Sequence, residues 1–196
     1  MFKSYTITRL GTEAQTAPIR VDQFTGDGGI YGEAQVQWDE DGLYVTLRAY
    51  EKEPLARYTS LNDPVCKDSC IEFFFSPQEG DVSYFNFETN PLGTLYCGFG
   101  QDRYTGKPQF TENWKEYFDI RNERTEDGFV IRYHIPLAFI RKYLPDCTLY
   151  SGKKMRGNFY KCGEDTPVEH YLSWSRVDTP RPDFHRPEFF GYFTLE

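Results

Sequence analysis

Long apolar stretches and a basic surface are both missing from this sequence of 196 residues. No apolar run approaches the length that spans a membrane, so we expect no membrane-spanning helix and no membrane partner. The chain has 22 lysine and arginine residues against 30 aspartate and glutamate residues, a formal charge of −8. Nucleic acids bind basic surfaces, so this balance argues against a nucleic-acid partner. Residues 1–7 lack the apolar core of a secretory signal, which predicts a cytoplasmic protein, or a secreted one if a leader has been removed.

Paired cysteine motifs are also missing. The five cysteines include no C-x-x-C pair, and an odd number cannot be fully bridged within one chain. No Asn-x-Ser/Thr acceptor for N-glycosylation is present. We therefore expect reduced, partly buried thiols. Cys66 and Cys70 could chelate a soft metal, but two thiols supply only half of a zinc site.

The common enzyme motifs do not occur. There is no G-x-S-x-G, no P-loop and no complete G-x-G-x-x-G motif. Glu72 and Glu88 could be the acid and base of a glycosidase, which needs two carboxylates that flank the scissile bond. A strand register that places them directly opposite each other would bring them too close for either hydrolytic mechanism. We expect no catalytic activity.

Short strand-like segments separated by turn signals make up most of the chain. We find no linker, repeat or low-complexity run, which predicts one domain over residues 1–196. Besides two strands discussed below, the expected strands are 43–50, 119–125, 129–135, 155–161 and 188–195. One short helix is expected over 136–143, with proline in its first turn. This pattern predicts an all-β fold, a single antiparallel β-sandwich of jelly-roll or immunoglobulin-like type with one short helix.

Two aromatic strands, 71–75 and 84–90, carry the clearest functional signal. Successive side chains of a strand point to opposite faces. One face therefore carries Ile71, Phe73, Phe75, Phe85 and Phe87, and the other carries Glu72, Phe74, Tyr84, Asn86 and Glu88. If the strands form a hairpin with matched apolar faces, Phe73 lies near Phe85 and Glu72 lies opposite Asn86. The second face suits a sugar, because carboxylates and amides bond hydroxyl groups and rings stack on C–H faces; its aromatic residues need cover from a loop or a ligand.

Several segments spread over most of the chain match a known pattern. They are Trp38-x-x-x-Gly-Leu-Tyr-Val, Asp68-Ser-Cys-Ile-Glu-Phe-Phe, residues 84–90 with Gly93, Trp174, and Pro182-Asp-Phe-His-Arg-Pro-Glu-Phe-Phe-Gly. Together they resemble carbohydrate-binding module family 9, of the DOMON-like β-sandwich superfamily. The resemblance implies that two rings sandwich the end of a glycan and that structural calcium stiffens loops. It also implies an association with glycoside hydrolases and carbohydrate catabolism.

The resemblance also assigns residues to a site. Glu72 matches the family's sugar-bonding glutamate, and Asn86 stands where its enzyme modules have an arginine. Cys66 replaces the first sandwiching tryptophan, while Phe184 best matches the second aromatic residue. The carbohydrate-binding residues that we expect are Glu72, Asn86, Glu88, Phe184, Trp174, His185, Arg186 and Tyr84. They would bind a mono- or oligosaccharide on an open sheet face, with a dissociation constant of roughly millimolar to micromolar.

Other interpretations of the sequence stay open. The candidate calcium ligands are Asp22, Asp27, Asp39 and Asp41, although carboxylates beside glycine turns are commonly solvated. A haem-binding relative would use Met155 with His134 or His170. A protein-interaction or structural domain without a sugar ligand would form a homo-oligomer that buries the Glu72 face.

Overall fold

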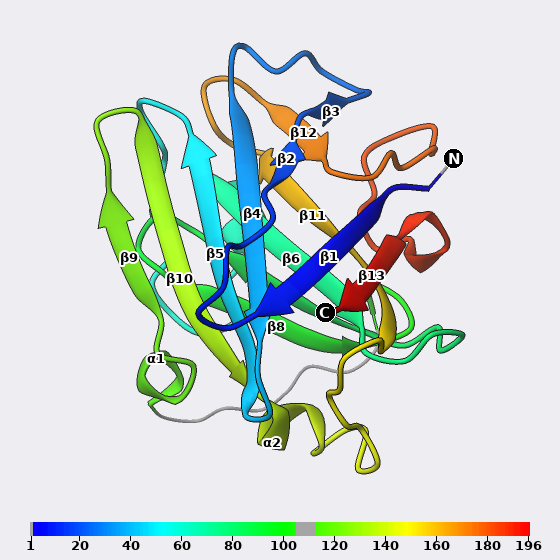
Figure 1. The fold of residues 1–196 in the computed structure, drawn as a ribbon. Coiled ribbons are helices and arrows are strands. Elements are labelled where there is room, and N and C mark those ends of the chain that lie inside the picture. The colour runs from blue at the N-terminus through cyan, green and yellow to red at the C-terminus, as the bar shows by residue number, and fades with distance from the viewer. Residues whose placement is uncertain (1, 105–112) are drawn as a thin grey trace.

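The computed structural model describes residues 2–104 and 113–196, which form thirteen strands and four short helical segments (Figure 1). The strands are β1 Ser4–Arg9, β2 Ala17–Ile19, β3 Val21–Asp22, β4 Tyr31–Trp38, β5 Gly42–Tyr50, β6 Cys70–Ser76, β7 Tyr84–Thr89, β8 Leu95–Gly100, β9 Arg121–Arg124, β10 Gly128–Pro136, β11 Lys154–Gly163, β12 His170–Ser173 and β13 Gly191–Leu195. The helical segments are the 3-10 turns η1 Val65–Lys67 and η2 Pro187–Phe189, and the helices α1 Trp114–Tyr117 and α2 Leu137–Ile140. The predicted all-β class is confirmed. None of the helices in these two ranges has the length and apolar character needed to cross a membrane.

Hydrogen bonds join the strands into one curled sheet, in the order β8-β7-β6-β11-β13-β1-β4-β5-β10-β9. Strand β1 lies in the middle of this order and runs parallel to both of its neighbours, so the prediction of an antiparallel sheet is wrong at this strand. Its residues Ser4–Ile7 pair with β13, and Thr8 and Arg9 pair with β4. Strand β1 thus joins two halves of the sheet, the β6 half (β8, β7, β6, β11, β13) and the β5 half (β4, β5, β10, β9).

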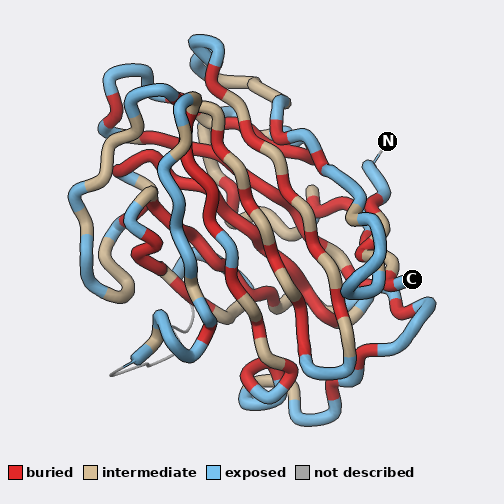
Figure 2. Tube along the Cα trace, turned by 60° about the vertical axis from the view of Figure 1, so that its left-hand side comes forward, coloured by how far each residue is buried: buried red, intermediate tan, exposed pale blue. Residues whose placement is uncertain are grey.

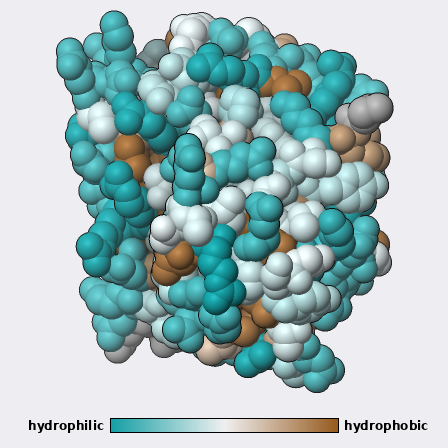
Figure 3. Space-filling view, in the orientation of Figure 1, coloured by the Kyte–Doolittle hydropathy of each residue, from teal (hydrophilic) through white to brown (hydrophobic). Residues whose placement is uncertain are grey.

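The inward faces of the two halves enclose the main core. Strands β4 and β5 alternate between buried and partly exposed residues, so one side of each strand faces the core (Figure 2). Rings meet across the interior: Phe87 of β7 stacks on Tyr133 of β10 at 5.7 Å between ring centroids. Phe85 of β7 contacts Phe139 of α2 at 5.6 Å. On the face shown in Figure 3, apolar side chains appear only as scattered spots, because most of them point into this core.

The β6–β7 hairpin forms, but in a different register from the predicted one. The observed pairs are Ile71 with Thr89, Glu72 with Glu88, Phe73 with Phe87, Phe74 with Asn86 and Phe75 with Phe85. The predicted pairing of Glu72 with Asn86, and of Phe73 with Phe85, is wrong by two residues. A shift of two residues keeps every side chain on its face, so the apolar pattern cannot distinguish the two registers.

The turn of this hairpin selects the register. Its midpoint is Gly80, whose φ of +89° is a left-handed conformation that glycine adopts without strain. The Asp81 carboxylate then accepts a hydrogen bond from the Ser83 backbone N–H at 2.8 Å. The Ser76 hydroxyl donates to the backbone carbonyl groups of Gln78 and Asp81.

Element boundaries depart from the predicted ones where proline intervenes. The predicted helix 136–143 is the shorter α2, and Pro136 is the last residue of β10. The predicted strand 188–195 begins only at Gly191, because residues 187–189 form a 3-10 turn with Pro187 at its start. The predicted strands 119–125 and 129–135 correspond to β9 and β10, which pair with each other in antiparallel register. Helix α1 was not predicted from the sequence.

Candidate functional site

The polar face of β6 and β7 lies on the side of the sheet away from the main core. The burial of its residues corrects the expectation of an open surface: the exposed fraction is 2% for Glu72, 5% for Asn86 and 6% for Glu88. Phe74 and Tyr84, which needed cover, are fully buried on the same face. This face therefore forms a second, smaller core, and its carboxyl groups lie inside it.

The cover is a segment of the same chain, residues 182–190, which we call the strap. The Phe184 ring stacks on Tyr160 of β11 with centroids 4.1 Å apart and planes 9° apart. The Tyr84 hydroxyl and His185 Nδ1 form a hydrogen bond of 2.8 Å. Phe190 contacts the Tyr84 ring edge-on at 5.4 Å. Because the strap already covers the Glu72 face, a partner subunit is not required to bury it.

A small cleft remains between the strap, β6, β7 and the end of β11. Its volume of about 60 Å³ holds a few water molecules, less than a sugar ring needs. The residues that line it are Cys66, Glu72, Glu88, Arg103, Cys162, Glu164, Tyr171, Pro182, Asp183, Phe184 and His185. Four predicted site residues, Glu72, Glu88, Phe184 and His185, are thus brought together from three separate segments.

Two facing carboxyl groups dominate the electrostatics of the cleft. Burial raises the pKa of Glu72 to about 7. Burial, and then the charge of Glu72, raise the pKa of Glu88 well above its ordinary range. One Glu88 oxygen accepts a hydrogen bond from the Asn86 amide at 2.8 Å. The pair therefore retains at least one proton near neutral pH.

His185 lies beside this pair without forming an ion pair at neutral pH. Its Nε2 is 3.9 Å from a Glu88 oxygen. Burial, and then the positive charge of Arg103, lower the pKa of His185 to about 4. The ring is therefore neutral at pH 7 and offers one donor and one acceptor nitrogen.

The remaining predicted residues take other positions. Asn86 and Tyr84 stand directly behind the cleft, where they bond Glu88 and His185. Trp174 is 3% exposed and packs in the main core, edge-on to Phe159 at 5.9 Å. The Arg186 guanidinium bonds the Glu188 carboxylate at 2.7 Å and lines a neighbouring depression. The structure therefore does not bring Trp174 or Arg186 to the cleft.

Several lining residues were missed from the sequence. Arg103, which pairs with Asp183 at 3.3 Å, follows β8, and Glu164 follows β11. Tyr171 lies on β12 and Cys162 on β11. Loop residues carry no periodic pattern. Cys162 comes near Glu72 only through the pairing of β6 with β11, and Tyr171 only through the further pairing of β11 with β12.

Three of the four aspartates predicted as calcium ligands accept hydrogen bonds from backbone groups of their own turns. Asp22 accepts from the N–H groups of residues 24 and 25, and Asp27 from that of residue 29. Asp39 accepts from the N–H groups of residues 41 and 42 and from the Tyr44 hydroxyl. These contacts account for their position beside glycine turns; calcium binding by Asp22, Asp27, Asp39 or Asp41 stays a prediction.

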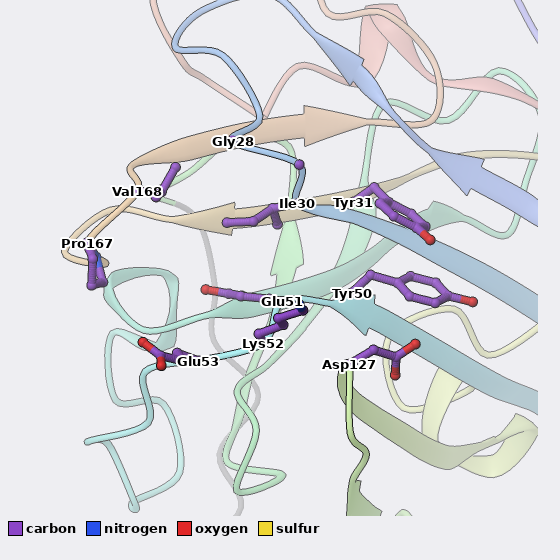
Figure 4. A pocket seen from close by; sticks show the side chains of 11 residues that line it. Gly28, Ile30, Tyr31, Tyr50, Glu51, Lys52, Glu53, Asp127, Pro167 and Val168 are labelled. Atoms are coloured by element: carbon purple, nitrogen blue, oxygen red, sulfur yellow. The ribbon is translucent and has the colours of Figure 1, made fainter.

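A larger hollow of about 620 Å³ lies elsewhere, between the loop before β4 and residues 50–53 (Figure 4). Its two tyrosines, Tyr31 and Tyr50, stack on each other at 4.1 Å between centroids. The guanidinium groups of Arg20 and Arg48 lie 3.5 Å and 4.7 Å from the centroids of Tyr31 and Tyr50, respectively. Each tyrosine ring already contacts the other ring and an arginine, so this hollow lacks the free aromatic face on which a sugar stacks.

The residues proposed for haem do not line the cleft either. Met155 is fully buried in the main core. His170 binds the Lys161 ammonium group at 2.7 Å and the Val168 carbonyl at 2.6 Å. His134 stacks on Tyr44 at 4.4 Å. These side chains already have structural contacts.

Comparisons with solved structures give the same fold. A candidate carbohydrate-binding protein from Bacteroides uniformis is 25% identical, covers 100% of both chains and has a TM-score of 0.80. A carbohydrate-binding module of family 9 from Caldicellulosiruptor kristjanssonii, in complex with cellotriose, is 12% identical over 99% of this chain and 94% of its own, with a TM-score of 0.68. The same kind of module in complex with glucose is 12% identical over 99% and 96%, with a TM-score of 0.70.

Sequence comparison adds the family. No curated protein matches this chain. The sequence profile of carbohydrate-binding family 9 matches residues 32–195, a range that includes every residue lining the cleft. The chain therefore belongs to carbohydrate-binding family 9.

Proposed function

We propose that this protein is a non-catalytic carbohydrate-binding module and that the cleft is its site for a mono- or oligosaccharide. The observation that carries the proposal is the convergence of Glu72, Glu88, Phe184 and His185 on one cleft. Two family-9 structures of this fold contain cellotriose and glucose, which supports a neutral sugar as the ligand class.

The cleft offers hydrogen-bonding groups of both kinds to sugar hydroxyls. A protonated carboxyl group donates and an ionised one accepts, so the Glu72–Glu88 pair can do both near neutral pH. The neutral His185 ring adds one further donor or acceptor. Arg103 at the mouth supplies a planar fork of N–H donors, and Phe184 supplies the apolar contact.

The size of the cleft sets a condition for binding. A sugar ring enters only if the strap moves outward, which breaks the hydrogen bond between Tyr84 and His185. The free energy of this opening offsets part of the contact energy. We therefore expect modest affinity, with a dissociation constant of roughly millimolar to micromolar.

The pairing of Glu72 with Glu88 supports binding over hydrolysis. The two are direct cross-strand partners, the arrangement that places carboxyl groups too close to flank a glycosidic bond with room for a water molecule. We further propose that residues 1–196 form one β-sandwich domain, with the β6 half and the β5 half as its layers.

A thermal-shift screen of the full chain against glucose, cellotriose and a wider sugar panel tests the function. A sugar that binds only the folded state raises the melting temperature, and the screen is run with calcium and with EDTA. Arg103→Ala and Glu88→Gln should weaken binding of the active sugar at least tenfold. Arg121→Ala, an exposed arginine on β9 in the other half of the sheet, should bind like the wild type.

Two outcomes would contradict the proposal. One is the absence of a shift with every sugar in the panel. The other is a shift of equal size in the wild type and in both cleft variants, which would place the sugar elsewhere on the molecule.

A further inference from the structure

Two thiols and a carboxylate meet at the base of the cleft. Cys70 of β6 and Cys162 of β11 are direct partners across the antiparallel pair. Glu72 follows Cys70 by two residues and so points to the same face. The ligand atoms of these three residues all lie within 4.8 Å of one another, and Cys162 Sγ is 3.1 Å from Glu72 Oε1.

No other group of three or more histidine, cysteine, aspartate or glutamate side chains comes this close within residues 2–104 and 113–196. We propose that Cys70, Glu72 and Cys162 bind a divalent cation that prefers sulfur ligands, and that Zn²⁺ fits them best. Zinc binds thiolate sulfur at about 2.3 Å and carboxylate oxygen at about 2.1 Å, so its tetrahedral ligands lie about 3.5 to 3.8 Å apart. The three ligand atoms need only small movements to reach that spacing, and Cys162 Sγ and Glu72 Oε1, which are 3.1 Å apart, move slightly away from each other.

Cys66 is the natural candidate for the fourth position. It belongs to the 3-10 turn η1, is half-buried and lines the same cleft. Its carbonyl oxygen lies 3.8 Å from Cys162 Sγ, so the turn is held against the group. Its thiolate, or a water molecule that enters through the cleft, would complete four-fold coordination.

The charged residues around the group are mostly acidic: Glu88 and Glu164 line the cleft, and the Arg103 guanidinium there pairs with Asp183 at 3.3 Å. The nearest basic residue on β11, Lys161, faces the other side of the strand and pairs with Glu51 at 2.8 Å. A bound metal ion would supply the positive charge that lets the thiols and Glu72 ionise.

The two remaining cysteines provide a comparison within the same protein. Cys97 and Cys147 are also buried, but they lie in the main core among apolar residues. Burial alone therefore does not distinguish the proposed ligands; their grouping around Glu72 does. Sequence spacing could not reveal this group, because 92 positions separate Cys70 from Cys162.

This metal site goes beyond the proposed function and does not depend on it. The metal would take the Glu72 oxygen that now accepts the Cys162 proton, and the second oxygen would stay available to the cleft. A sugar and a metal ion could therefore occupy the region together.

The test is a cobalt titration of reduced, EDTA-treated full-length protein, followed by competition with Zn²⁺. We expect one Co²⁺ per chain, with a thiolate-to-metal absorption band, proton release and a higher melting temperature. Cys162→Ser and Cys70→Ser should weaken Co²⁺ binding at least tenfold, and Cys97→Ser and Cys147→Ser should leave it unchanged. If the serine variants fail to fold, Glu72→Gln replaces them, since it keeps the shape and an acceptor oxygen but removes the ionisable ligand.

The results separate the two proposals. A wild-type protein without a thiolate–cobalt band, or an equal loss in Cys97→Ser, overturns the metal site. Sugar binding measured in EDTA is independent of that result. A protein that binds cobalt and no sugar contradicts the proposed function alone.

Discussion

Glu72 couples the stability of the protein to pH. The folded-state pKa is about 7, above its ordinary value of 4.5. Between these values the folded state holds a proton that the unfolded chain has released, so the free energy of unfolding falls as pH rises from 4.5 to 7. His185 acts in the opposite direction, because its folded-state pKa of about 4 lies below its ordinary value of 6.5. Its contribution to stability rises with pH across that window.

The variant Glu72→Gln removes the Glu72 carboxyl group and keeps His185, so the stability difference between variant and wild type reports on Glu72. Relative to the wild type in EDTA, the variant should gain about 3 kcal/mol of stability between pH 4.5 and 7 from the loss of the Glu72 titration, and a further gain at higher pH because the charge of Glu72 no longer raises the pKa of Glu88. Urea denaturation at several pH values measures the difference. The exposed Glu53→Gln should show no such trend. A constant difference between Glu72→Gln and wild type at every pH would show that Glu72 titrates normally.

The pattern of single residues predicted one part of the site well. Strand alternation correctly assigned Glu72, Phe74, Tyr84, Asn86 and Glu88 to one face, because side-chain direction is a local property of a strand. Phe184 and His185 came from the family resemblance, since nothing local shows that residues 182–190 cross this face.

The rest of the cleft depends on contacts that are distant in the sequence. Arg103 and Glu164 lie on loops, and Cys162 reaches Glu72 only through the β6–β11 pairing. Trp174 resembles a binding-site aromatic residue in the sequence, yet its side chain packs in the main core. Local patterns do not determine which strands become neighbours, and therefore could not predict these positions.

At the level of elements, one buried hydroxyl group strengthens the contact between β1 and β4. Tyr5 of β1 is 2% exposed, and its hydroxyl accepts a hydrogen bond from the Val36 N–H of β4 at 2.9 Å. It donates to the Gln15 carbonyl at 2.7 Å. Strand β1 pairs with β4 only at its last two residues, so this hydroxyl extends the connection between the two halves.

Tyr5→Phe should therefore destabilise the protein by about 1 to 3 kcal/mol, because it leaves the buried Val36 N–H without a partner. Urea denaturation followed by circular dichroism measures the loss. Tyr104→Phe removes the hydroxyl from a tyrosine that is 90% exposed and should change nothing. If both variants unfold like the wild type, the Tyr5 hydroxyl does not support the junction.

Element boundaries show a similar limit on prediction. The apolar residues of β5, β10 and β11 predicted the bounds of those strands closely. The β6–β7 register was missed by two residues because both registers satisfy the same apolar pattern, and the conformation of Gly80 decides between them.

For the molecule as a whole, the shared core predicts how it unfolds. Phe87 of the β6 half stacks on Tyr133 of the β5 half, so neither half retains its core alone. We expect one cooperative transition. Tryptophan fluorescence, which reports on the buried Trp38 and Trp174 and on the partly exposed Trp114, and far-ultraviolet circular dichroism should give the same urea midpoint. Two separated midpoints would show that the halves are independent units and contradict the one-domain proposal.

The parallel pairing of β1 with β13 also has a consequence during synthesis on the ribosome. Strand β1 is translated before its partner β13, and the strands β2 to β12 lie between them in the sequence. Until β13 emerges from the ribosome, the backbone N–H and C=O groups of Ser4–Ile7 have no hydrogen-bond partners on that side. The nascent chain then presents an open strand edge. All strands from β2 to β12 are therefore translated before β1 and β13 can pair, so a chain that lacks β13 exposes an edge that chaperones or a neighbouring nascent chain can bind.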